Sequence, residues 1–152
     1  MPDNLATRPR HGRYPIPWVT TVRDGVPDFR VHDDLRRWRV ATERRCQLCG
    51  FTMGRPVAMI GTARSADLRT FGEPPAHPAC MDYAVAVCPW LNGSDASRRP
   101  MPSVVDVMAR RLQPDTLILV TVPDFEGMQD LDNRTIGYRA LGDYTSTRVV
   151  ER

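Results

Sequence analysis

The chain contains no lysine, although 21 of its 152 residues are basic, so every basic side chain is an arginine. A GC-rich genome accounts for this bias, because arginine codons are rich in G and C and lysine codons are not. The physical consequence is that all positive side-chain charge is carried by guanidinium groups. These groups bind phosphate and carboxylate in a bidentate geometry that an ammonium group does not offer.

Long apolar segments are also missing. No run approaches the roughly 18 residues needed to span a bilayer, and residues 1–13 lack the apolar core of a secretory signal. We therefore expect a cytoplasmic protein with no membrane partner. In a reducing compartment, closely spaced cysteines indicate metal ligands before they indicate disulfides.

Catalytic motifs are equally scarce. The chain has three histidines, and it contains no phosphate-binding glycine loop, no His-Glu-x-x-His motif and no hydrolase order of Ser, His and Asp. No group of residues combines a nucleophile, a base and a charge-stabilising partner. We therefore expect a protein that is not an enzyme.

What the sequence does contain is a cluster of metal-ligating residues, because all four cysteines and one histidine lie within residues 46–88. Cys-x-x-Cys followed by glycine is typical of a metal-binding knuckle, and His-x-x-Cys at a helix start places two further ligands on one face. Two ligands from each motif can complete a tetrahedron around one structural Zn²⁺. The predicted ligands are Cys46, Cys49, His77 and Cys80.

Cys88 leaves an alternative ligand set open. It lies eight positions after Cys80, which on a continuous helix is about 12 Å along the axis. One zinc ion then cannot bind both, and Cys88 is predicted to be a buried apolar thiol. If the helix breaks, Cys88 replaces His77 as the fourth ligand.

The remaining pattern predicts a small α+β fold, with a flexible arm at residues 1–12 and one domain at residues 13–152. Asp24-Gly25 favours a hairpin turn, Asp33 or Asp34 is suited to cap a helix, and Leu35, Trp38 and Ala41 recur at helical spacing. The expected strands cover residues 14–22, 29–31, 57–60, 68–71, 116–122, 136–141 and 145–150. The expected helices cover residues 35–45, 79–87 and 104–112. The expected irregular segments are a polar turn at 61–67, a connector at 92–103 and an acidic loop at 123–133.

The order of knuckle, hairpin and ligand-bearing helix resembles the treble-clef zinc finger over about residues 44–90. The chain as a whole is similar to a group of small zinc-finger proteins encoded by actinobacteria and their phages. That resemblance implies the same metal site and brings no activity with it. It is carried by Pro15-Ile-Pro-Trp18, Pro27-Asp-Phe-Arg30, Arg45-Cys-x-Leu-Cys-Gly50, Glu73-Pro-Pro-x-His-Pro-x-Cys80 and Val87-Cys-Pro-Trp-Leu91.

Charge is spread unevenly. Residues 1–45 carry 10 arginines against 6 acids, or +4, whereas residues 101–152 carry 6 arginines against 8 acids, or −2. The basic first third favours a zinc-stabilised module that contacts nucleic acid, although runs of charge are more often a solvated surface. Tyr14 and Trp18 are candidates for stacking on bases. The predicted nucleic-acid-binding residues are Arg36, Arg37, Arg39, Arg44, Arg45 and Arg55.

Two other functions are compatible with the sequence. The first is a phage or mobile-element protein that binds a host or regulatory protein, for which the acidic stretch from Asp124 to Asp132 would suit a basic partner. The second is a metal-dependent nuclease of the treble-clef type. The nuclease is disfavoured because residues 51–72 contain no histidine.

Overall fold

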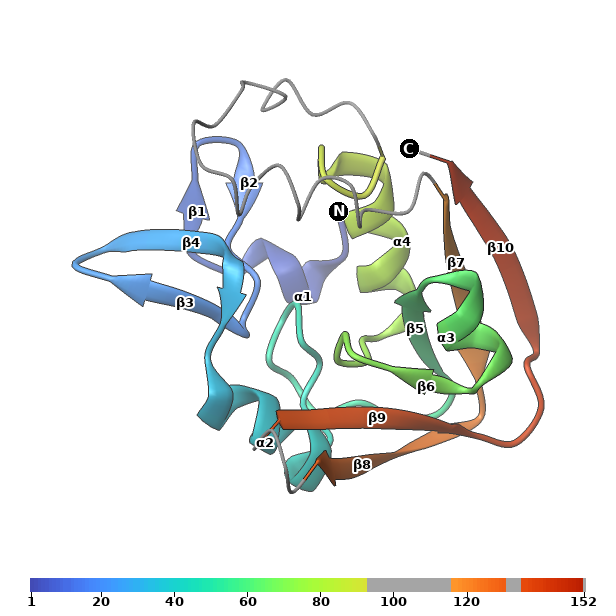
Figure 1. Ribbon diagram of the computed structural model, residues 1–152. Helices are drawn as coiled ribbons and strands as arrows, with labels where there is room; N and C mark the ends of the chain where they lie inside the picture. Colours follow the sequence, from blue (N-terminus) through green and yellow to red (C-terminus); the bar gives the residue numbers. More distant parts are fainter. Residues whose placement is uncertain (93–115, 131–134, 152) are drawn as a thin grey trace, which may run out of the picture.

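The computed structural model describes residues 1–92, 116–130 and 135–151 (Figure 1). The expected connector from residue 93 onwards and the expected helix at 104–112 lie outside the described residues. The helices are α1 (Asp3–Ala6), α2 (Asp34–Glu43), α3 (Ala63–Asp67) and α4 (Pro78–Val87). The strands are β1 (Arg10–His11), β2 (Tyr14–Pro15), β3 (Thr20–Arg23), β4 (Val26–His32), β5 (Val57–Gly61), β6 (Thr70–Phe71), β7 (Thr116–Val122), β8 (Asp124–Asp130), β9 (Thr135–Leu141) and β10 (Ser146–Glu151).

This mixture of helices and strands confirms the α+β class. Two antiparallel sheets of three strands each, with orders β10-β7-β5 and β6-β9-β8, form the larger part of the fold, and two separate hairpins, β1-β2 and β3-β4, precede them. The predicted strand at 116–122 is β7, which is central in its sheet. No helix within the described ranges has the length and apolar character to cross a bilayer.

The two larger sheets are joined at a corner. Only Pro123 separates β7 from β8, and β9 returns to β10 through a turn in which Gly142 has a φ of 78°. A Cβ on Gly142 would lie 3.0 Å from Cγ of Pro123, so the two crossings pack closely against each other. The chain therefore crosses between the two sheets twice at the same place, once from β7 to β8 and once from β9 to β10 (Figure 1).

The prediction of an acidic loop at residues 123–133 is wrong for its first part. Residues 124–130 form β8, which pairs with β9 along its whole length. Phe125 is buried, whereas Glu126 is exposed and forms a 3.0 Å ion pair with its cross-strand partner Arg139. Glu126 thus lies on the solvent face of a strand, where its charge is paired across to the neighbouring strand and does not oppose pairing.

The prediction of a hairpin between residues 57–60 and 68–71 is also wrong. β5 pairs with β7 and β6 pairs with β9, so the two strands belong to different sheets. Between them the expected polar turn contains α3, whose first turn is capped by the Thr62 hydroxyl accepting the Ser65 N–H at 3.1 Å. All four side chains of Val57–Ile60 are buried, as in a strand covered on both faces.

The first residues also differ from the prediction of an arm. They contain α1 and β1, and Leu5 is only 3% exposed because it packs into the main core. The predicted strand at 14–22 is divided, since Tyr14–Pro15 pairs back onto β1 and only the part from Thr20 enters the β3-β4 hairpin. The hairpin turn itself is confirmed, with φ values of 49° at Asp24 and 78° at Gly25.

Helix α2 begins as predicted, because Asp33 accepts the backbone N–H of Arg36 at 2.9 Å. Of its three periodic apolar residues only Ala41 is packed, while Leu35 is 70% exposed and Trp38 is 39% exposed. Ala41 faces Gly127 of β8, where an added Cβ would come within 2.5 Å of the Ala41 Cβ. The absence of a side chain at Gly127 thus allows α2 to approach β8 closely, next to Val40, which is the fully buried residue of the helix.

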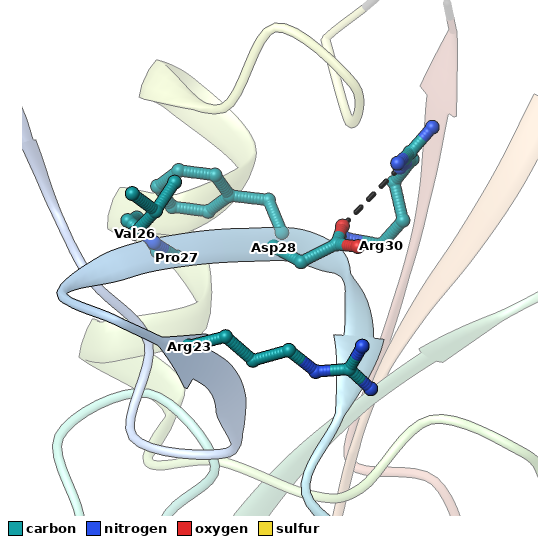
Figure 2. A pocket seen from close by; sticks show the side chains of 6 residues that line it. Arg23, Val26, Pro27, Asp28 and Arg30 are labelled. Carbon is teal, nitrogen blue, oxygen red and sulfur yellow. Dashed lines mark hydrogen bonds and ion pairs between the residues drawn. The ribbon is translucent and has the colours of Figure 1, made fainter.

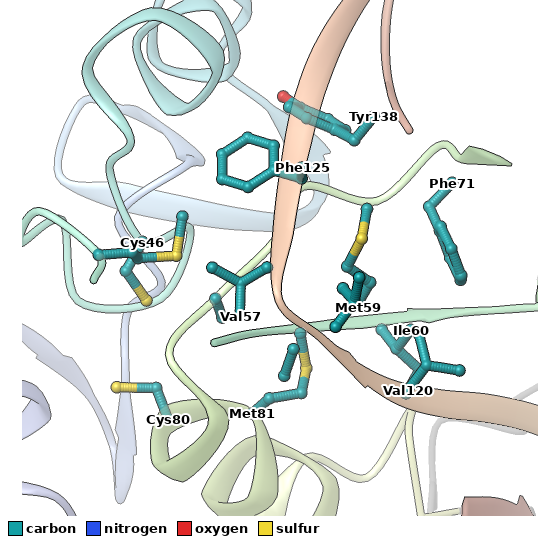
Figure 3. Packing of buried hydrophobic residues seen from close by; sticks show 14 of the residues in the cluster. Cys46, Val57, Met59, Ile60, Phe71, Cys80, Met81, Val120, Phe125 and Tyr138 are labelled. Carbon is teal, nitrogen blue, oxygen red and sulfur yellow. The ribbon is translucent and has the colours of Figure 1, made fainter. Parts of the chain in front are cut away.

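The core lies between the larger sheets, α2 and α4, and Tyr138 is its largest fully buried residue (Figure 3). The phenol donates a hydrogen bond of 2.9 Å to the backbone carbonyl of Arg37, which joins β9 to α2 across 101 residues. The ring lies 6.3 Å from that of Phe125. Burial raises the pKa of Tyr138 to about 12, above its ordinary value of 10.0.

We expect Tyr138 to make the free energy of unfolding fall between pH 10 and pH 12. The folded chain holds a proton that the unfolded chain releases above pH 10, so the contribution is complete below pH 10 and disappears as pH approaches 12. Urea unfolding at pH 9 and pH 11.5 should show a loss that is larger in the wild type than in Tyr138→Phe by about 1–2 kcal/mol. Equal losses in the two proteins would contradict this assignment.

Candidate metal centre

The predicted knuckle is formed by residues 46–50. The N–H of Gly50 donates to the Cys46 carbonyl at 2.9 Å, and the N–H of Cys46 donates to the Phe51 carbonyl at 2.9 Å. Gly50 has a φ of 82°, a conformation that favours glycine, and a Cβ there would lie 2.6 Å from the Trp18 ring. The turn brings the side chains of Cys46 and Cys49 to the same side.

The second ligand pair is held against the knuckle by backbone hydrogen bonds. Ala76 exchanges two hydrogen bonds of 2.9 Å with Ala58 of β5, and the Gln47 N–H donates to the Pro75 carbonyl at 3.2 Å. The buried Gln47 side chain donates to the carbonyl of Pro74. His77 then occupies the N-cap position of α4, and Cys80 follows in the first helical turn.

A third segment closes the knuckle from the N-terminal side. The N–H groups of Trp18 and Val19 donate to the carbonyls of Leu48 and Gln47 at 2.9 and 3.0 Å. Both carbonyls lie between the two knuckle cysteines. The site is therefore fixed by segments that are distant in sequence, and each contributes backbone hydrogen bonds.

These contacts gather four potential ligand atoms within 4.8 Å of one another, from Cys46, Cys49, His77 and Cys80. Nδ1 of His77 lies 3.4 Å from Sγ of Cys49 and 3.9 Å from Sγ of Cys80. A tetrahedral ion with ordinary zinc bond lengths requires about 3.6 Å between nitrogen and sulfur ligands. The observed separations fit a group of ligands around one ion.

His77 is oriented by its second ring nitrogen. Nε2 lies 3.2 Å from the backbone carbonyl of Thr52, which accepts its proton. That contact leaves the lone pair of Nδ1 directed towards the sulfur atoms, as in metal sites where a carbonyl fixes the histidine tautomer. Thr52 is a positioning residue that the sequence did not reveal, because it acts through its backbone.

The electrostatics of the cluster also favour a cation. The sulfur atoms of Cys46, Cys49 and Cys80 are buried. Contacts with Cys46 and Cys49, together with burial, raise the pKa of the Cys80 thiol. Three thiolates so close together repel one another in a dry site, whereas a bound cation reverses this effect and deprotonates its thiol ligands.

Cys88 does not belong to the cluster. It is the C-cap residue of α4, where its N–H donates to the Ala84 carbonyl at 2.8 Å. Its side chain is half-buried. Within the described residues the gathered set contains His77, which corresponds to the first of the two ligand sets that the sequence allows.

The six arginines predicted to contact nucleic acid are bonded within the chain. Arg36 donates to the Trp18 carbonyl at 2.6 Å, and Arg37 donates to the carbonyls of Gly72 and Ile136 at 2.8 and 2.6 Å. These two side chains connect α2 to the N-terminal segment and to the sheet. Because N–H groups of Arg36 and Arg37 already bond backbone carbonyls, fewer of their N–H groups remain to bind a phosphate.

The other four arginines form ion pairs. Arg39 binds Glu43 through two hydrogen bonds of 2.8 and 3.0 Å, and Arg45 contacts the same carboxylate at 3.1 Å. These hydrogen bonds hold the pKa of Glu43 below its ordinary value, and the contact with Arg39 has the larger effect. Arg44 binds Asp124 at 2.6 Å, and Arg55 pairs with the other oxygen of that carboxylate. The acidic partner Asp124 was expected in a loop and instead begins β8.

Comparisons with protein-family models, with curated proteins and with solved structures gave no match for this chain. The similarity to actinobacterial and phage zinc-finger proteins therefore stays a prediction from sequence motifs. What can be stated of the site comes from its own geometry, which is that of a group of three cysteines and one histidine able to hold a metal ion.

Proposed function

We propose that Cys46, Cys49, His77 and Cys80 bind one structural Zn²⁺ and that the protein is a zinc-stabilised, non-catalytic binding module. The observation that carries this proposal is the gathering of four ligand atoms within 4.8 Å. Three sulfurs and one imidazole nitrogen form a donor set that zinc prefers, in the tetrahedral geometry it adopts. Reduced thiols in such a site agree with a cytoplasmic location.

A structural role follows from the composition of the site. All four positions of a tetrahedron are supplied by side chains, three of them buried, so no position is left for a water molecule or a substrate. Closed sites of this kind stabilise folds, whereas catalytic zinc sites keep one position open. The bound ion would connect the knuckle to the start of α4 and contribute its binding energy to folding.

The centre is treble-clef-like in the origin of its ligands, since one pair comes from a knuckle and the other from a helix start. The segment between them departs from a simple zinc hairpin, because β5 and β6 pair with strands from the C-terminal third. In this proposal the zinc unit is integrated into the sheets and does not form a separate finger.

The proposed partner of the module is nucleic acid. The support is the excess of positive charge in residues 1–45, carried only by guanidinium groups. A protein partner is the second candidate. It is favoured by six exposed large apolar side chains within one stretch of 17 residues, namely Val22, Val26, Phe29, Val31, Leu35 and Trp38.

The ligand assignment leads to a direct prediction about metal content. The purified protein should hold one zinc ion per chain. Loss of a residue that only orients a metal ligand lowers metal affinity by about 10–100-fold. Because His77 is itself a proposed ligand, His77→Ala should lower zinc affinity by more than this. Elemental analysis identifies the ion, and competition with a chromophoric chelator gives the affinity.

Cys88→Ser is the matched control for Cys49→Ser, because both variants exchange a thiol for a hydroxyl and only Cys49 lies in the cluster. Cys49→Ser should lose affinity and Cys88→Ser should keep it. Wild-type affinity in His77→Ala, combined with a loss in Cys88→Ser, would show that the other ligand set is correct.

A further inference from the structure

Residues 4–23 contain four arginines and no acidic residue. The first three, Arg8, Arg10 and Arg13, belong to the short hairpin of β1 and β2 and its flanks, here called the basic hairpin (residues 8–15). Arg23 ends β3, at the turn of the second hairpin. This stretch of 20 residues therefore has a charge of +4, whereas α2 has three arginines against two acids and a charge of +1.

Two of these guanidinium groups have no hydrogen-bond acceptor among the described residues. Arg13 lies over the Tyr14 ring at 5.0 Å, and Arg23 makes no hydrogen bond to the Asp28–Arg30 pair, although its charge acts on the Asp28 carboxylate (Figure 2). Arg10 uses one nitrogen to bond the Arg13 carbonyl at 2.7 Å, which closes the turn of the basic hairpin. This differs from the six predicted arginines, each of which is bonded to an acceptor of the fold.

Exposed rings accompany these charges. His11 of the basic hairpin meets Phe29 of β4 edge-to-face, with ring centroids 6.0 Å apart. His11 is exposed and Phe29 is 46% exposed, so both rings contact solvent. Phe29 and Arg23 also line a shallow hollow of about 520 Å³ on the second hairpin (Figure 2). The His11–Phe29 contact makes the two hairpins one continuous surface.

We infer that the basic hairpin, together with Arg23 and Phe29, binds single-stranded nucleic acid. Arg10, Arg13 and Arg23 contact backbone phosphates, and the rings of His11 and Phe29 stack on unpaired bases. This inference rests on the proposed nucleic-acid function and moves its site from α2 to the two N-terminal hairpins. Single strands are favoured over duplexes because stacking needs the flat face of a base, which a duplex covers.

Charge decides between nucleic acid and a protein as the occupant of this surface. Apolar neighbours such as Val22 and Val26 suit a protein, and the hollow itself is electrically mixed because Asp28 lines it beside Arg23 and Arg30. The excess of positive charge comes from residues 4–23, which contain four arginines and no acid, and it opposes a basic partner. A polyanion with planar groups matches both the arginines and the rings. The protein partner is therefore an outcome of the test below.

Fluorescence anisotropy with labelled 20-nucleotide probes tests the inference. Zinc-loaded protein is titrated with single-stranded DNA, single-stranded RNA and duplex DNA at several salt concentrations. Three phosphate contacts predict a slope of log K against log salt of about −2 for the single strands. Arg13→Gln and Arg23→Gln should each reduce this slope by about 0.7, and Phe29→Ala should weaken binding by about 5- to 150-fold.

Arg64→Gln is the matched control, because Arg64 is an exposed arginine of α3 that also has no acceptor among the described residues. It should leave the affinity and the slope unchanged. Thermal unfolding and zinc content establish that each variant is folded. If Phe29→Ala does not fold, Arg13→Gln still decides the question, since that guanidinium makes no hydrogen bond in the described fold.

Three results would overturn the inference, and they differ in what they leave standing. Single-strand binding that falls no more in Arg13→Gln and Phe29→Ala than in Arg64→Gln rejects this surface and keeps the nucleic-acid function. Tighter binding of the duplex rejects single strands as the ligand. Absence of binding to every probe at 50 mM salt also rejects nucleic acid as the partner, and the apolar side chains of the second hairpin then favour a protein.

Discussion

Removal of the metal is expected to unfold the protein. Structural zinc sites contribute apparent binding free energies of about 10–16 kcal/mol, which is comparable to the whole stability of most domains, about 5–15 kcal/mol. Without an ion, three buried cysteines remain in contact and the connection between the knuckle and α4 is reduced to hydrogen bonds. Both a strong chelator and the variant Cys80→Ser should therefore abolish cooperative unfolding at 25 °C.

Circular dichroism reports the loss of the sheets, and tryptophan fluorescence reports the knuckle because the Trp18 ring lies against Gly50. Cys88→Ser serves as the control, since its thiol lies outside the cluster and is only half-buried. A Cys80→Ser protein that keeps a wild-type unfolding transition would show that the metal is dispensable. Restored folding after zinc is added back to the chelated wild type would support the structural role.

The second large effect is expected from Phe71→Ala. Phe71 is fully buried at the end of β6, and its ring lies so close to β5 that a Cβ on Gly61 would approach it to 2.9 Å (Figure 3). The ring occupies the space that the missing side chain of Gly61 leaves free. Removing the ring in Phe71→Ala therefore creates a cavity between the two larger sheets. Such deletions cost about 3–5 kcal/mol, which corresponds to a decrease in Tm of roughly 6–20 °C for a chain of this size.

Phe51→Ala provides the comparison, because this phenylalanine lies beyond the knuckle and is 51% exposed. Its loss removes the same atoms from a site already in contact with water and should change stability by no more than about 0.5 kcal/mol. The two variants are compared by urea unfolding of zinc-loaded protein. Similar destabilisation of both would mean that Phe71 does not occupy the tightly packed position described here.

Several parts of this fold could be predicted from local signals in the sequence. Asp24-Gly25, the Asp33 cap and the strand at 116–122 rest on turn chemistry, capping and periodicity, which act between neighbouring residues. The ligand group was accessible for the same reason, since Cys-x-x-Cys and His-x-x-Cys reflect local geometry. The structure brings these four residues together.

The rest depends on contacts between distant residues, which a single sequence does not display. The pattern of residues 57–61 predicts a strand covered on both faces, but nothing in it specifies that its partner in the sheet is β7. Similarly, the close approach of α2 to β8 depends on Gly127, which lies more than 80 residues further along the chain. The predicted arginine surface was affected in the same way, because its acceptors include backbone carbonyls and a carboxylate of β8.

The sheet order also determines when each part of the protein can be completed during synthesis. All four ligands have been translated once residue 80 is reached, whereas β5 and β6 find their partners only in strands that end at residues 122 and 141. At about 5–20 residues per second, translation from residue 80 to residue 151 takes ~4–14 s. During that interval the nascent chain carries a complete set of zinc ligands beside two strands without neighbours. An ion captured at this stage would hold β5 near the knuckle until the last third of the chain leaves the ribosome.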